Sequence, residues 1–495
     1  MSANHNHRSH RTHVHRRFAR CAGRAGAWVV AALFLLPPGA TRADETTKST
    51  IADRESLAIT IYSSNLALVK DVRKIQVPTG VVNLKFEGVA AHIDPTSVYI
   101  RSLTSPDQLA ILEQNFEYDL ISPAKLMEKY LGRNIELVFV RDKKEIRKRA
   151  RLIGNQGGYV YEIDNQIVIN PPGRVVLPDL PEGLISRPTL IWMLQNGRSR
   201  HTIEASYLTG GIGWRANYVL VLSEDDREVD LTGWVTINNQ SGATYNDAAI
   251  KLVAGDVHRA PAARGGRHLR EVLSADGIVA EEQFKEQAFF EYHLYTLQRT
   301  STIKENQTKQ INLLDAEGVG VEKHYVFSPR RATWTRQTAA SEKAKVSVFL
   351  SLENSEDNNL GKPLPKGVVR VYKKDADGAL QFAGEDRIDH TPEDEIVRVK
   401  LGEAFDVVGE RTQTDFKVVR NDQRGRIFES EYEIEIRNHK DEDIVVAVEE
   451  MIPGDWDIQE KSHDFVKVSS SRVRFDIPVA KKSSATLTYR VRIKY

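Results

Sequence analysis

Two-residue alternation of apolar and polar side chains recurs along this 495-residue chain and is clearest at its C-terminal end. One set of positions there is apolar or aromatic (Leu487, Tyr489, Val491, Ile493 and Tyr495), and the positions between them are polar (Thr488, Arg490, Arg492 and Lys494). Successive residues of a strand point to opposite faces of its sheet, so the pattern predicts one buried and one wet face. This is typical of antiparallel sheets.

The same rhythm predicts three hairpins. The first joins residues 432–436 to 444–448 through the polar loop 438–443, and the second joins 229–237 to 249–253 through the loop 238–242. The third joins 368–372 to 380–382 around Asp375-Ala376-Asp377-Gly378. That D-x-D-G run resembles the start of a calcium loop, but the following residues lack the ligand and the glycine that an EF-hand needs. We therefore expect a plain turn.

Two segments favour helix. Ser122-Pro123 suits a helix start and Gly132 a helix end, and a second candidate lies within residues 281–288. Strands with so few helices between them indicate sheets packed on sheets. The predicted fold is mostly β: antiparallel β-sandwich domains and a β-rich N-terminal domain with one short helix.

The first 43 residues have the pattern of a secretory signal peptide. Seven arginines and no acidic residue accompany an apolar run at 25–36, then Pro37-Pro38-Gly39 and small residues up to Ala43. We expect cleavage between Ala43 and Asp44 and a periplasmic or extracellular protein. A membrane anchor is the rival interpretation, but the run is shorter than the roughly 20 residues that span a bilayer. Arg16-Arg17-Phe18 leaves both the general and the twin-arginine export routes open.

Loss of this leader changes the charge of the chain. It carries seven of the 69 Lys and Arg, none of the 68 Asp and Glu, and the single cysteine, Cys21. The remainder has a net charge near −6 and no thiol, which excludes disulfides, thiolate metal sites and cysteine nucleophiles. Such a balance predicts no nucleic-acid partner, although it leaves room for a local basic patch. No integral membrane segment is expected after leader removal.

Composition suggests the domain boundaries. After a flexible tail at 44–54, we expect a β-rich domain at 55–204. A β-sandwich region follows at 205–335, with a mobile insertion at 259–287 that is rich in glycine and charge. Residues 336–495 form the C-terminal β-sandwich.

Motifs of the common enzyme classes are absent from the sequence: it has no G-x-S-x-G, H-E-x-x-H, P-loop or dinucleotide fingerprint. The nearest constellation is Asp256 and His258, which could share a strand face and touch a ligand or metal, or could simply be a polar strand end. Trp456, between two aspartates, could stack on a sugar ring or plug the end of a sandwich. No cofactor, metal or catalytic residue is predicted.

Several segments resemble one protein family: residues 57–62 (LAITIY), 66–69 (LALV), 188–192 (PTLIW), 206–218 (SYLTGGIGWRANY), the region 239–252 and the final strands. Their combination resembles exported bacterial proteins with a domain of unknown function 4139, the mucoidy-inhibitor-like family. The resemblance extends over nearly all of the chain after the leader and implies no catalytic residue. Many relatives carry a long coiled coil in the first domain, whereas residues 141–151 here are charged but too short and lack heptads.

The sequence therefore predicts an exported cell-envelope protein, a non-enzymatic binding or structural β-sandwich protein whose partner is an envelope protein or glycan. One alternative is a carboxylate-dependent hydrolase acting on envelope or extracellular polysaccharide. The second alternative is a surface adhesin.

Overall fold

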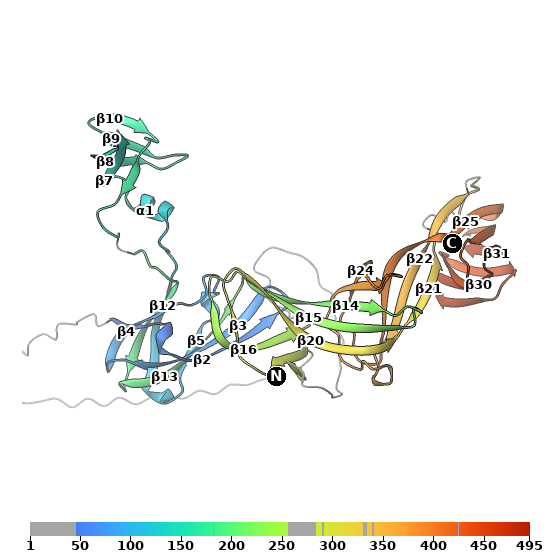
Figure 1. Cartoon of the computed structure of the whole chain (residues 1–495), viewed down its shortest axis with the longest axis horizontal. Helices are drawn as coiled ribbons and strands as arrows, with labels where there is room; N and C mark the ends of the chain where they lie inside the picture. Colours follow the sequence, from blue (N-terminus) through green and yellow to red (C-terminus); the bar gives the residue numbers. More distant parts are fainter. Residues whose placement is uncertain are drawn as a thin grey trace, which may run out of the picture. The chain divides into compact units, whose positions relative to one another are not determined.

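The computed structural model describes residues 46–141, 143–181, 183–255, 284–289, 292–329, 334–338, 341–423 and 425–495. Strands dominate this part of the chain, which confirms the mostly-β prediction (Figure 1). Short 3₁₀ turns connect some strands: η1 (Ile51–Asp53), η2 (Pro95–Ser97), η3 (Pro106–Gln108) and η4 (Glu356–Asn358). Ala43 and Asp44 lie outside the described residues.

Two sheets are built mainly from the N-terminal part of the chain. The four-stranded sheet has the order β1 (Thr46–Ser49), β4 (Gly80–Glu87), β12 (Thr189–Asn196) and β6 (Leu109–Glu117). The eight-stranded sheet has the order β17 (Phe284–Phe289), β18 (Tyr292–Leu297), β16 (Tyr245–Ala254), β2 (Arg54–Tyr62), β3 (Leu66–Gln76), β13 (Arg200–Thr209) and β5 (Tyr99–Ser102), with β19 (Ser301–Ile303) beside β16. The helix predicted within 281–288 is wrong, because its described part is strand β17, which pairs along its length with β18.

A smaller sheet occupies an insertion between the adjacent strands β6 and β12. Its order is β10 (Gln166–Ile169), β9 (Val160–Ile163), β8 (Lys144–Gly154), β7 (Asn134–Arg141) and β11 (Arg174–Val176). The predicted helix is α1 (Pro123–Lys129), in which the Ser122 hydroxyl accepts a hydrogen bond from the Lys125 N–H at 3.2 Å. Among the described residues α1 is the only α-helix, and it packs Met127 on this sheet.

Two further sheets complete the described chain. The five-stranded sheet has the order β20 (Gln307–Gly320), β15 (Glu228–Asn239), β14 (Ile212–Leu222), β23 (Gly367–Lys374) and β24 (Leu380–Ile388). The nine-stranded sheet has the order β28 (Asp455–Lys461), β31 (Ser483–Lys494), β26 (Gly425–Asn438), β25 (Ile396–Asp422), β22 (Glu342–Glu353), β21 (Glu322–Phe327), β27 (Ile444–Met451), β30 (Arg472–Val479) and β29 (Phe465–Ser469).

Three hydrophobic cores hold these sheets. The first draws on residues from Leu57 to Val399, the second on residues from Tyr325 to Ile493, and the third belongs to the small sheet. Strands β22 and β25 contribute to both large cores, since Leu352 and Val399 lie in the first and Val346 and Val407 in the second. Strand pairing and packing thus continue across the boundaries expected at 204/205 and 335/336.

The β23–β24 hairpin is confirmed, and its turn is closed by Asp375, whose carboxylate accepts the N–H groups of Asp377 and Ala379 at 3.1 and 2.9 Å. The other two predicted hairpins are wrong. Strand β15 does not pair with β16, which joins β2 in the eight-stranded sheet, and β26 does not pair with β27, which lies between β21 and β30. The chain crosses to another strand position at both places.

A buried asparagine ends the strand before each of these crossovers. The Asn239 amide donates to the carbonyls of Ala243 and Lys304 at 2.8 and 3.0 Å. The Asn438 amide donates to the carbonyls of Glu442, Val479 and Ala480 at 2.9, 3.3 and 3.2 Å. These bonds satisfy backbone carbonyls of the crossover loop and of a segment beside it, so the short loop leaves its sheet with its buried polar groups paired.

Asn438→Ala should therefore lower the free energy of unfolding of the second core by about 3 kcal/mol, because buried carbonyls lose their donor. Asn421, an exposed residue of β25, provides the control, and Asn421→Ala should change stability by less than about 0.5 kcal/mol. Urea unfolding of both variants measures the difference. Equal stability of the two would show that the Asn438 amide is dispensable.

Candidate functional site

Of the ligand-site candidates named from the sequence, Asp256 and His258 lie outside the described residues. Trp456 is described and is 7% exposed within the second core. Its indole N–H donates to the Ser470 carbonyl at 2.7 Å, and the Lys467 ammonium lies 4.5 Å from its ring centroid. The ring is thus packed and its polar atom satisfied, so it offers no open face of the kind that stacks on a sugar.

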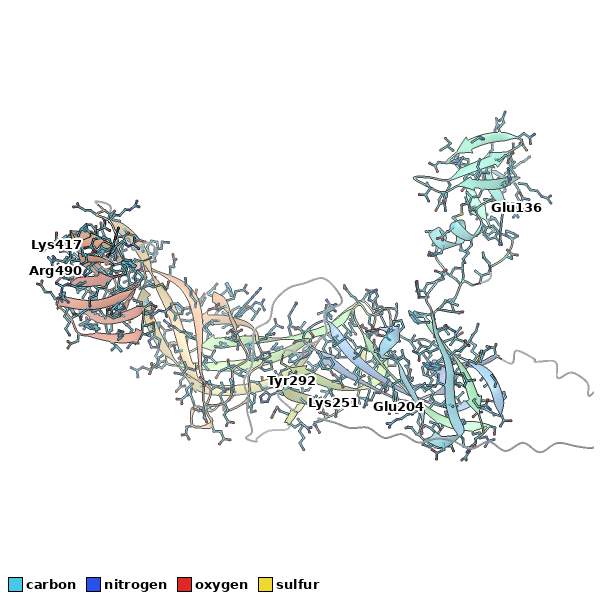
Figure 2. The ribbon with its side chains drawn as sticks, turned by 180° about the vertical axis from the view of Figure 1, so that it is seen from behind. Glu136, Glu204, Lys251, Tyr292, Lys417 and Arg490 are labelled. Carbon is cyan, nitrogen blue, oxygen red and sulfur yellow. The ribbon has the colours of Figure 1, made fainter. Side chains whose placement is uncertain are left out.

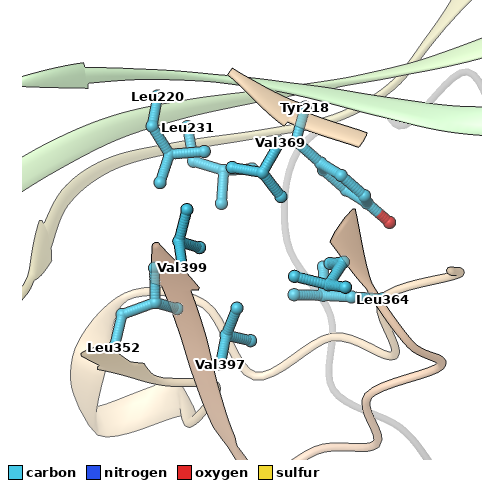
Figure 3. Close-up of a pocket in the computed structure, with 9 residues that line it drawn as sticks. Tyr218, Leu220, Leu231, Leu352, Leu364, Val369, Val397 and Val399 are labelled. Carbon is cyan, nitrogen blue, oxygen red and sulfur yellow. The ribbon is translucent and has the colours of Figure 1, made fainter. Parts of the chain in front are cut away.

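A small cavity lies where the five-stranded sheet meets β22 and β25 (Figure 3). Leu220, Leu231 and Val369 face Leu352, Val397 and Val399 across it, and its volume is about 10 Å³. The one hydroxyl in its wall, that of Tyr218, donates to the Pro365 carbonyl at 2.7 Å. A void this small with apolar walls is a packing gap, since even a bound water needs comparable volume and several polar partners.

Two charged clusters are buried in the large cores. In the first, Asp71 on β3 accepts hydrogen bonds from the guanidinium groups of Arg54 and Arg73, with closest approaches of 2.6 and 2.8 Å. Arg73 is fully buried, stacks 3.5 Å over the Phe86 ring and donates to the Glu87 carbonyl at 3.0 Å. Because its donors reach β3 and β4 at once, this cluster joins the eight-stranded sheet to the four-stranded one.

The pKa of Asp71 reflects this environment. Burial alone would raise the pKa, but hydrogen bonds and charge attraction from Arg54 and Arg73 outweigh it and hold the pKa below its ordinary value. The carboxylate is therefore kept ionised by two cations, which is the signature of a structural ion pair and not of a proton carrier.

The second cluster lies in the second core. Arg411 on β25 donates to Glu450 on β27 at 2.6 Å, and the two side chains are 4% and 1% exposed. The guanidinium also lies 3.7 Å from the ring centroid of Tyr432 and 5.1 Å from that of Trp334. Tyr489 is buried and stacks on Tyr432, with ring centroids 5.6 Å apart.

This cluster is incompletely paired. The second guanidinium nitrogen of Arg411, one carboxylate oxygen of Glu450 and the Tyr489 hydroxyl face one another, but none of them makes a hydrogen bond of good geometry among the described residues. Burial raises the pKa of Glu450, against the opposing effect of Arg411. Burial likewise lowers the pKa of Arg411, but attraction to Glu450 outweighs it, and the guanidinium stays cationic. The cluster is closed to solvent, so its two charges interact inside the second core with little screening by water.

A carboxylate and an imidazole meet on the β17–β18 hairpin. The His293 Nδ1 lies 2.7 Å from a carboxylate oxygen of Glu286, and each side chain is 15% exposed. His293 pairs across the sheet with Ala254, and Tyr292, labelled in Figure 2, packs on Gly255. A carboxylate that orients an imidazole is a common arrangement in general-base chemistry and in simple ion pairs.

The small sheet presents a different kind of candidate. β10 is one of its two edge strands, and Ile167 and Ile169 on that strand are 71% and 68% exposed. An edge strand has unpaired backbone N–H and C=O groups, and exposed apolar residues beside them are unfavourable in water. This combination suits the addition of an extended segment from a partner.

No cluster of three or more His, Cys, Asp or Glu side chains among the described residues has an arrangement suited to a metal ion. None of the helices in this part of the chain has the length and apolar character to span a membrane.

Comparison with known proteins identifies the family to which this mostly β chain belongs. The chain belongs to the family of the domain of unknown function DUF4139, whose model matches residues 203–495. The match covers the nine-stranded sheet, the second core and much of the first core, and it leaves out the small sheet. No curated protein matches the chain.

Sequence reasoning missed the charged clusters, although a signal for them exists. Asp71 and Arg73 continue the inward face that Val69 and Ile75 define by alternation, and Glu450 continues the face of Val446 and Val448. A charged residue in step with an apolar face marks a buried charge that needs a partner.

Proposed function

We propose that this protein is exported to the cell envelope, in the periplasm or outside the cell, and acts there as a non-enzymatic binding or structural component. The pattern of the first 43 residues, with its apolar run and Ala43, supports export. The similarity of residues 206–218 and the final strands to mucoidy-inhibitor-like proteins supports the same location.

The observation that carries the binding role is the edge strand β10. Two isoleucines at alternate positions, Ile167 and Ile169, are exposed beside unpaired backbone groups. An extended peptide of an envelope protein would pair with β10 through its backbone and cover both side chains. Covering two large aliphatic residues would contribute about 3 kcal/mol in addition to the backbone hydrogen bonds.

The test screens residues 45–495, which form one compact unit, against panels of peptides and glycans. Ile167→Asp/Ile169→Asp should weaken peptide binding at least about tenfold. Leu380 and Phe382 provide a matched control, since they are exposed at alternate positions of another edge strand, β24. Equal loss of binding in Leu380→Asp/Phe382→Asp would place the binding site elsewhere.

The Glu286–His293 pair is the observation that favours the hydrolase as a second candidate. If the pair acted as a general base, turnover of a polysaccharide would fall by about 10²-fold or more in His293→Ala and Glu286→Gln. We expect binding without turnover in the wild type. Turnover that these changes abolish in a folded protein would replace the non-enzymatic proposal.

Export has its own test. The protein recovered from the envelope fraction of its source cells should begin at Asp44, as measured by mass spectrometry of its N-terminal peptide. Recovery of the protein with Met1 still attached would contradict signal cleavage.

A further inference from the structure

Residues 141–151 carry the densest positive charge of the chain after the leader, with seven Lys and Arg and two Asp and Glu. Three of the cations have acidic partners: Arg147 lies 3.3 Å from Glu136, Lys148 2.7 Å from Asp164 and Arg151 2.6 Å from Glu162. The other cations are exposed and have no acidic partner among the described residues; they are Arg141, Lys143, Lys144 and Arg149. A strongly basic surface thus stands on a protein whose remainder is acidic.

This charge lies on a projecting ribbon. Strand β8 pairs with β9 only from Arg151 onward, and β7 pairs with β11 only as far as Val138. From Phe139 on β7 and up to Ile146 on β8, the hairpin therefore continues with only two strands beyond the others of the small sheet, with Arg141 opposite Lys144 at its end. Glu136, labelled in Figure 2, marks the base of this ribbon.

Aliphatic side chains stand among the cations. Val140 is 74% exposed and Ile146 is 42% exposed, and they lie within two residues of Arg141 and Lys144. Nothing in the ribbon buries them, since it has only two strands, and two-stranded ribbons have no interior. Protein segments that bind at a membrane interface combine exposed apolar residues with cations, and this hairpin has both.

We propose that the tip of the β7–β8 hairpin docks on an anionic lipid surface. The tip cations Arg141, Lys143 and Lys144 would lie against the phosphate headgroups. Val140 and Ile146 lie on opposite faces of the ribbon, since they pair with Glu145 and Phe139, and would enter the boundary between headgroups and acyl chains as the tip inserts end-on. A soluble polyanion would use the cations alone, so the aliphatic pair selects lipid as the partner. The inference does not depend on the ligand of β10.

The experiment is cosedimentation of residues 45–495 with vesicles of phosphatidylcholine that contain about 30% phosphatidylglycerol, and with vesicles of pure phosphatidylcholine. Binding should occur only to the anionic vesicles and should weaken as salt rises, because salt screens the attraction. Lys143→Ala/Lys144→Ala should weaken it about 30-fold, since each lysine near such a surface contributes roughly fivefold. Val140→Ser/Ile146→Ser should weaken it about tenfold with no change in charge.

Lys343 and Lys345 on β22 supply the control, because they are 69% and 70% exposed, carry the same charge and lie beside the acidic residues Glu410 and Glu403. Lys343→Ala/Lys345→Ala has the same net charge as the hairpin variant and should bind like the wild type. Equal weakening by both lysine pairs would overturn the proposal in favour of non-specific attraction. Binding to dextran sulfate together with indifference to Val140→Ser/Ile146→Ser would identify a polyanion site instead.

Discussion

Replacing Asp71 by alanine should lower the free energy of unfolding by about 3–5 kcal/mol, because it leaves a buried guanidinium without its counter-ion. Arg73 has no exposed surface, and its remaining acceptors are the carbonyls of Ser49 and Glu87 and the Ser49 hydroxyl. Carbonyls do not neutralise a full charge, so the cost falls on the junction of β1, β3 and β4. Urea unfolding, with amide hydrogen exchange in β3 and β4 as a local probe, measures the loss.

A control for Asp71 lies on the same two strands. Glu55 on β2 and Lys74 on β3 also form an ion pair at 2.6 Å, but their side chains are 42% and 68% exposed. Glu55→Ala should therefore cost less than about 1 kcal/mol, as surface ion pairs do. A loss of similar size in both variants would mean that burial does not govern the energy of these pairs.

The lowered pKa of Asp71 also predicts a dependence on pH. A carboxyl with a folded pKa below its unfolded value of 3.8 stabilises the fold above that value, and the contribution disappears as pH falls through the folded pKa. The stability of the wild type should thus fall between about pH 5 and pH 2 more steeply than that of Asp71→Asn, which has no proton to bind there. Urea midpoints measured across this range test the difference. Parallel curves would show that Asp71 is not held ionised.

In strands with one buried and one exposed face, the alternation of apolar and polar residues predicts which side chains are buried. In β31 the residues Leu487, Tyr489, Val491 and Ile493 are buried, as the alternation predicts, whereas Tyr495, which follows the strand, is 42% exposed. The turn at Asp375 and the helix start at Ser122 were also predictable, because both depend on side chains that bond to the backbone a few residues away. Local chemistry of this kind is complete within a short stretch of sequence.

The crossovers were not predictable for the opposite reason. A strand, a polar loop and a second strand look the same whether the strands pair or pass to different positions, since the choice depends on partners far away. β16 pairs with β2 nearly two hundred residues earlier in the chain, and β27 pairs with β21. The buried Asn239 and Asn438 close these loops with carbonyls as distant as Lys304 and Val479, so the signal is spread over separate segments.

The candidate sites likewise have some features that the sequence predicts and others that depend on strand pairing. The basic character of residues 141–151 is visible in the sequence, but the projection of the hairpin beyond β9 and β11 is not. Glu286 and His293 lie seven residues apart, and their contact depends on the pairing of β17 with β18, whereas the sequence predicts a helix within residues 281–288. Pairs across a hairpin become predictable only when the strands themselves are.

Glu450→Ala should destabilise the second core by about 3–5 kcal/mol, the other large effect expected in this protein. The change leaves the Arg411 guanidinium without a counter-ion between β25 and β27, where it also contacts the ring faces of Tyr432 and Trp334. Those rings attract the cation but accept no full hydrogen bond from it. Adjacent Glu449 is the control, because it points to the outer face of β27, and Glu449→Ala should cost less than about 1 kcal/mol.

A double replacement separates the cost of an unpaired charge from the value of the pair. The pair is desolvated and leaves polar atoms of Arg411, Glu450 and Tyr489 unbonded, so its net contribution should be small. Arg411→Met/Glu450→Leu should therefore regain most of the stability that Glu450→Ala loses, with the recovery seen in hydrogen exchange of β25 and β27. If the double variant is as unstable as the single one, the ion pair itself stabilises the sandwich, and the incomplete bonding of the cluster carries no energetic cost.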